Sequence, residues 1–482
     1  MIIVLLFVVC FTSCRRSFYP YSAKPTKEPF SLDLSRYKSP QLRDGQNANL
    51  ELGMAISGGG SRASFFGLGV MLELEKLRMG GSSNILNEID YFSTVSGGGF
   101  CAAYYIAQYA HHQQLYARDG ETFSLNHIWH QSNEAKYNLP HIDLNSTFFK
   151  NVFIHNLFRP GKRLAQEIDS IGRSVLLENR YDMRGNPYRT LFLGDIFIDT
   201  AYPEQPTLPI FITNATFYEN NTRLPMVPVL LDSLHVTGLY HPQVDFIGGA
   251  DYIPLHYGVT ASASFPGILM QIRFQTKDSS LIRIIDGGVS DNFGYKSMVD
   301  VYRRKPHKES QRLILIDASG QGLPSPISKH RPVGFFKVLR KMLYSGLESK
   351  YAESQEEVKQ FFQNDSSFAF IGINNIRKHC EQNNWPVPAI INTNGLVSWP
   401  KVYDSLVAMI GEPINHNTKP EAIDSPDKFW LLFELAANVP TKLYAYPEES
   451  ALLVLAGRVA VRLNEERLLQ LVNIPAFKTP AF

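Results

Sequence analysis

The stretch Ile89-Asp-Tyr-Phe-Ser-Thr-Val-Ser96-Gly-Gly-Gly-Phe-Cys101 decides the fold class of this chain. Its first part, 89–95, is rich in apolar, β-branched and aromatic residues, which predicts a buried strand with these bounds. The glycines after Ser96 predict a sharp turn, and a helix is expected from there to about Tyr116. A serine at a strand-to-helix turn is typical of a nucleophile elbow. Because Thr94 replaces the first glycine of G-x-S-x-G, the alternative that Ser96 only caps a helix stays open.

A second glycine turn, Ser57-Gly-Gly-Gly60-Ser-Arg62, precedes this one. It follows an apolar run at 52–57 and opens a segment at 63–77 that is apolar nearly all round, as in a buried crossover helix. Repeated strand, turn and helix predict a parallel sheet with right-handed crossovers. Such a turn presents N–H groups to an oxyanion or a phosphate. The P-loop pattern is absent, and Ser96 stands where a dinucleotide-binding strand would end in an acidic residue, so an oxyanion is favoured.

A third motif, Ile284-Ile285-Asp286-Gly287-Gly288, carries an aspartate from a strand into a glycine turn. Taken alone, such an aspartate predicts no more than a turn cap. Together, the three motifs resemble the patatin-like and cytosolic phospholipase A superfamily, in which a G-G-G-x-R turn, a serine elbow and a D-G-G aspartate follow in this order. Weaker similarities occur at 209–216, 260–266 and 439–443, and the resemblance spans about 50–470 except 118–190.

The resemblance implies a role for each matching residue. Ser96 would be the nucleophile and Asp286 its base, because a buried carboxylate in hydrogen-bond reach can take the seryl proton. Arg62 would stabilise an anionic headgroup or the oxyanion hole. The N–H groups of the oxyanion hole would come from Gly59 and Gly60, with Gly97 a weaker candidate.

The expected substrate is a phospholipid or another membrane glycerolipid, with no cofactor and no metal. A lipase, a thioesterase, a catalytically silent lipid-binding scaffold and a triad peptidase are the alternatives. A triad would need a histidine after Asp286, and none there stands in a recognisable motif: His307, His330, His379 and His416.

Composition and pattern indicate one large α/β domain over 50–482. The chain has 482 residues, 44% of them hydrophobic, and its net charge of +2 gives no basic excess for nucleic acid. The expected architecture is a mainly parallel sheet in a three-layer sandwich, with an inserted helical cap at 118–190. Further strands are predicted at 209–216, 244–247, 281–285, 312–317 and 367–373, and helices at 335–345, 352–363 and 448–471.

Two segments predict contact with a membrane. The apolar run from Ile2 to Thr12 ends in Ser13-Cys14, which resembles a bacterial lipoprotein box. We expect an export signal at 1–14, acylation of Cys14 and a polar tether at 15–49. Phe11 and the absence of a basic residue before the run leave two alternatives, an uncleaved signal and a wrongly assigned start of the chain. The stretch 146–163 combines phenylalanines with basic residues, which suits either a lipid interface or burial in the core.

Overall fold

The structure is a computed structural model of the whole chain. It describes residues 32–38, 47, 49–79, 83–117, 120–131, 173, 176–178, 180–182, 184–201, 207–239, 249–264, 272–278, 280–305, 308–319, 356–363, 365–391, 399–440 and 445–473. The predicted strand at 244–247, the predicted helix at 335–345, the stretch 146–163 and Cys14 lie outside these residues.

A mixed sheet forms the centre of the described part of the chain. In sheet order its strands are β5 (Val236–Leu239), β6 (Ile272–Thr276), β7 (Leu281–Asp286), β3 (Ile210–Phe217), β2 (Ile89–Val95), β1 (Glu51–Ile56), β8 (Gln311–Asp317) and β9 (Phe368–Gly372), with β4 (Arg223–Pro225) beside β3. Along one half of the sheet, the neighbouring strands β3, β2, β1, β8 and β9 pair in parallel. The strands β4, β5, β6 and β7 pair antiparallel with their neighbours. The predicted mainly parallel sheet is therefore confirmed, with an antiparallel edge that the sequence analysis did not predict.

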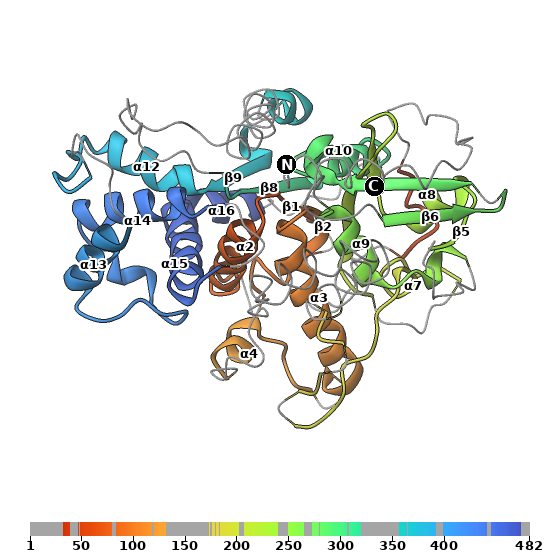
Figure 1. Cartoon of the computed structure of the whole chain (residues 1–482), viewed down its shortest axis with the longest axis horizontal. Coiled ribbons are helices and arrows are strands. Elements are labelled where there is room, and N and C mark those ends of the chain that lie inside the picture. The colour runs from red at the N-terminus through yellow and green to blue at the C-terminus, as the bar shows by residue number, and fades with distance from the viewer. Residues whose placement is uncertain are drawn as a thin grey trace, which may run out of the picture.

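Helices cover both faces of this sheet. They are α2 (Ser61–Leu74), α3 (Gly98–Leu115), α4 (Leu125–Gln131), α7 (Leu193–Ile196), α8 (Pro228–Ser233), α9 (Leu255–Ser262), α10 (Tyr295–Arg303), α12 (Ile373–Gln382), α13 (Trp399–Ile410), α14 (Pro426–Asn438), α15 (Pro447–Leu463) and α16 (Glu465–Val472). Figure 1 shows α2, α3 and α15 on one side of the sheet and α10 on the other. Every residue of β1, β2 and β3 is buried, as expected for strands covered on both faces.

The segment predicted as one helix at 448–471 is two helices, so this prediction was wrong. Asn464 leaves the helical conformation, with φ −114° and ψ 12°, and separates α15 from α16. Its side-chain amide donates to the Ala460 carbonyl at 2.7 Å, which satisfies a carbonyl near the end of α15. Within the predicted cap at 118–190, the described helix is α4.

Candidate active site

Ser96 stands at the sharp turn between β2 and α3, as the elbow pattern predicts. Its φ of 49° lies in the left-handed region, which is uncommon for a residue with a side chain. The surrounding structure must hold such a conformation, and strain of this kind is concentrated at functional sites. The turn is short, because β2 ends at Val95 and α3 begins at Gly98.

The two glycine turns touch each other beside Ser96. A Cβ atom added to Gly97 would lie 2.0 Å from the Gly60 carbonyl oxygen, so no side chain fits there. Gly60 itself has φ 61°. A Cβ on Gly58 would lie 3.4 Å from the Ser96 Cβ atom. Glycine is therefore required for the turn after β1 to pass directly beside the nucleophile.

Asp286 brings its carboxylate to Ser96 from the far side of β3. The Ser96 hydroxyl donates to Asp286 Oδ2 at 2.6 Å, and the Gly288 amide donates to Oδ1 at 2.7 Å. The side chain is buried, with 4% of the residue exposed. Burial raises the pKa of the Asp286 carboxyl from 3.8 to about 6, although the hydrogen bonds from Ser96 and Gly288 lower it. A carboxylate with such a pKa is suited to accept a proton near neutral pH.

The backbone amides of the first glycine turn differ in their partners. Gly58 donates to the Asn292 carbonyl at 2.9 Å. Among the described residues, the amides of Gly59 and Gly60 donate to no other group. These two amides therefore have no competing acceptor in the described part of the chain, and their role toward an oxyanion stays a prediction.

Arg62 connects the first glycine turn to the end of α14. Its Nη1 atom donates to the carbonyl oxygens of Ala437 and Val439, each at 3.3 Å. These carbonyls belong to the last turn of α14, where helical partners are missing and cations are favoured. Arg62 therefore has a structural role that the sequence did not predict, and its role toward substrate remains a proposal.

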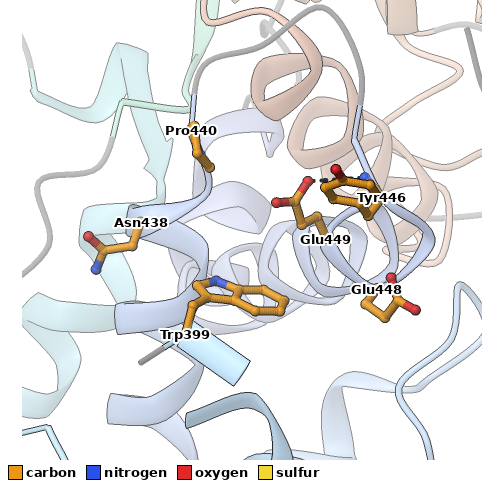
Figure 2. Close-up of a pocket in the computed structure, with 6 residues that line it drawn as sticks. All are labelled: Trp399, Asn438, Pro440, Tyr446, Glu448 and Glu449. Atoms are coloured by element: carbon orange, nitrogen blue, oxygen red, sulfur yellow. Dashed lines mark hydrogen bonds between the residues drawn. The ribbon is translucent and has the colours of Figure 1, made fainter. Parts of the chain in front are cut away.

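A cavity of about 340 Å³ lies beside this contact, lined by Trp399, Asn438, Pro440, Tyr446, Glu448 and Glu449 (Figure 2). Glu449 accepts a hydrogen bond from the Tyr446 amide at 3.0 Å, drawn as a dashed line in Figure 2. Both glutamates stand in the first turn of α15, where carboxylates stabilise the helix. The acidic residues in the cavity wall are therefore explained by their role in stabilising the start of α15.

Neither described histidine among the triad alternatives contacts Ser96 or Asp286. His379 packs against Trp385 and Phe429, and His416 bonds the Ser450 hydroxyl at 2.9 Å. In the described part of the chain, the hydrogen bonds to the Asp286 carboxylate come from Ser96 and Gly288. His307 and His330 lie outside the described residues.

Sequence reasoning missed Ser64 and Asn214, two buried polar residues behind the nucleophile. Ser64 donates its hydroxyl to the Gly97 carbonyl at 2.6 Å and so links the two turns. The Asn214 amide donates to Ser93 Oγ at 3.0 Å and to the Thr94 carbonyl at 3.1 Å, which ties β3 to β2. Both stand in elements that hold other polar residues as well, so the sequence pattern does not single out either of them.

A family model described as patatin-like phospholipase matches residues 54–299. This range holds the first glycine turn, the serine elbow and Asp286, and it covers just over half of the 482 residues. The chain belongs to the patatin-like phospholipase family.

Among solved structures, human GIVD cytosolic phospholipase A2 is similar at 12% identity, with a TM-score of 0.37, over 90% of this chain and 61% of that chain. The same human protein in complex with methyl gamma-linolenyl fluorophosphonate matches at 14% identity, with a TM-score of 0.36, over 91% and 62% of the two chains. The chain spans about three fifths of the length of these structures. No curated protein matches it in sequence.

Proposed function

We propose that this protein is a serine acyl-ester hydrolase of membrane glycerolipids, of the phospholipase A or lysophospholipase type, working through a Ser96–Asp286 dyad. The observation that carries the proposal is the 2.6 Å hydrogen bond from the Ser96 hydroxyl to the buried Asp286 carboxylate. Membership of the patatin-like phospholipase family supports the same chemistry.

In the first step, Asp286 accepts the hydroxyl proton as Ser96 Oγ attacks the ester carbonyl carbon. The carbonyl oxygen becomes an oxyanion, which the amides of Gly59 and Gly60 stabilise. One such donor contributes about 2.7–4 kcal/mol to transition-state binding. The tetrahedral intermediate then expels the alcohol, which takes its proton from Asp286 and leaves an acyl group on Ser96.

In the second step, water attacks the acyl-enzyme. Asp286, again a carboxylate, accepts a proton from the water and later returns one to Ser96 Oγ. The free fatty acid leaves, and the dyad regains its starting state. The pKa of about 6 supports this double role, because the group can gain and lose a proton at near-neutral pH.

Labelling with a fluorophosphonate tests the proposal directly. We expect one phosphonylated residue, mapped by mass spectrometry to Ser96, and none in Ser96→Ala. A wild-type protein that binds phospholipid vesicles but takes up no label at Ser96 would instead indicate a lipid-binding scaffold.

We also propose that acylation of Cys14 attaches the protein to a membrane. An anchor with two or more acyl chains would hold the protein stably, whereas a single acyl chain binds only marginally. In the described part of the chain, no helix is both long and apolar enough to cross a membrane. Mass spectrometry of the mature protein would show acylated Cys14 as its first residue. An intact N-terminus that still carries residues 1–13 would contradict this proposal.

A further inference from the structure

The turn that ends α9 contacts both residues of the dyad. Ser96 donates its backbone N–H to the Ser262 hydroxyl at 2.9 Å. Two residues later, the Ser264 carbonyl accepts the backbone N–H of Asp286 at 3.0 Å. Ser262 and Ser264 are both fully buried, with 0% of each residue exposed. One short segment thus reaches the nucleophile through a side chain and the base through its backbone.

The dyad needs such a connection because its two strands are not neighbours. Ser96 follows β2 and Asp286 ends β7, and β3 lies between these strands. Strand pairing therefore fixes the distance between Ser96 and Asp286 indirectly, through the intervening strand β3. Ser96 also has a left-handed φ of 49°, so its backbone needs a partner that holds it there.

The Ser262 hydroxyl joins the end of β2 to β3, and the Ser264 carbonyl in the same turn adds β7. The Ser262 hydroxyl accepts from the Ser96 amide and donates to the carbonyl oxygen of Asn214 in β3 at 2.5 Å. A hydroxyl is well suited to this place because it can donate and accept at once. The contact also occupies the Ser96 N–H, which leaves the amides of Gly59 and Gly60 to face an oxyanion.

We infer that Ser262 is a positioning residue of the acyl-transfer reaction, which orients the strained Ser96 backbone so that Oγ stays in reach of Asp286. The inference rests on the proposed function. Because Ser262 is fully buried, it acts through Ser96 and not through contact with substrate. Loss of its hydroxyl should therefore lower kcat and leave KM unchanged.

The test compares Ser262→Ala with the matched control Ser264→Ala. Both variants remove a buried hydroxyl from the same turn, but the Ser264 hydroxyl donates to the Thr260 carbonyl at 2.8 Å and its contact with Asp286 is through the backbone. On a soluble aryl ester, kcat should fall about ten- to hundredfold for Ser262→Ala, as expected for a misplaced reacting group, and less than about twofold for Ser264→Ala. The fluorophosphonate labelling rate of Ser96 should fall in parallel with kcat.

The pH profile adds a readout that a purely structural role would not move. The pKa of Asp286 is raised by burial and lowered by Ser96 and Gly288, so a weaker bond from Ser96 should shift half-maximal activity of Ser262→Ala to higher pH. Ser262→Thr, which keeps the hydroxyl, should recover kcat toward the wild-type value.

Equal losses in Ser262→Ala and Ser264→Ala, or a Ser262→Ala variant with wild-type kcat, would overturn the inference while leaving the proposed function intact. A wild-type protein that neither hydrolyses the ester nor takes up label at Ser96 would overturn the proposed function first, and the inference with it.

Discussion

The two residues of the proposed dyad, Ser96 and Asp286, lie on opposite sides of β3 and are held in different ways. On the parallel side, Ser96 lies where two glycine turns meet backbone to backbone, with the Gly60 carbonyl 2.0 Å from where a Cβ on Gly97 would be. On the antiparallel side, Asp286 ends β7 and its carboxylate is held by hydrogen bonds from Ser96 and Gly288. Ser96 is fixed by close packing, whereas Asp286 is fixed by polar contacts and burial.

Because of this difference, the two sides of β3 should lose activity in response to different kinds of change. Close backbone contact tolerates no added atom, so the parallel side should be sensitive to volume. Hydrogen bonds and burial set the protonation state, so the antiparallel side should be sensitive to charge and pH. The predictions below separate these two kinds of sensitivity.

The largest effect is expected from Ser96→Ala. Without the nucleophile, ester hydrolysis should fall by about a millionfold, the scale found when a catalytic unit loses its nucleophile. Turnover of an aryl ester by the purified variant, with its melting temperature as the control for folding, gives the measurement. A variant that retains a tenth of wild-type turnover would remove Ser96 from the mechanism.

Asp286→Asn tests the polar side without a change of volume. It should lower kcat by about 10⁴-fold or more, because the amide cannot accept the seryl proton. His379→Ala and His416→Ala serve as controls and should keep kcat within about twofold, since neither side chain contacts the dyad. A histidine variant as inactive as Asp286→Asn would replace the dyad by a triad.

Gly97→Ala tests the packed side with one methyl group. The new Cβ would force the Gly60 carbonyl away, so we expect a loss of activity of about a hundredfold and a cost of about 1–3 kcal/mol in the free energy of unfolding. Gly249→Ala is the matched control, because a Cβ there meets no atom of the described residues within 4 Å. Similar behaviour of the two variants would show that the contact between the turns is not required.

The pH dependence of kcat should follow the protonation of the Asp286 carboxyl. Activity requires the carboxylate form, so kcat should be half-maximal near pH 6, reach a plateau above about pH 7 and lie about tenfold below that plateau at pH 5. The folded-state pKa lies above its ordinary value of 3.8, so this group favours folding most below pH 4 and that contribution is lost as the pH rises through 6. At pH 8, Asp286→Asn should therefore melt no lower than the wild type. A profile still flat at pH 4 would contradict the raised pKa.

The smallest effect is expected from Arg62→Ala, which lies outside both sides of the dyad. Loss of the contacts with Ala437 and Val439 should lower the free energy of unfolding by about 1–3 kcal/mol. If Arg62 also binds a headgroup, hydrolysis of anionic phospholipids should fall several-fold more than hydrolysis of a neutral ester. Equal losses on both substrates would assign Arg62 a structural or general oxyanion role.

Local pattern predicted the parts of the site that depend on short stretches of chain. Ile89–Val95 was predicted with the same bounds that β2 has, because a run of β-branched and aromatic residues between turns admits few alternatives. The glycine turns were predicted from the same kind of signal. The break at Asn464 was missed, because apolar periodicity continues through it and one amide contact decides where the helix stops.

The sequence by itself determined the fold class, the elbow at Ser96 and the aspartate motif, because each depends on neighbours within a few residues. Only the tertiary structure decided that Ser96 and Asp286, 190 positions apart, meet at 2.6 Å across β3. It also decided that Ser262 contacts Ser96, that Ser264 contacts Asp286 and that Arg62 contacts α14. The physical reason is that these contacts depend on strand order and helix packing, which arise from burial of the whole core and leave no signature in a short stretch of sequence.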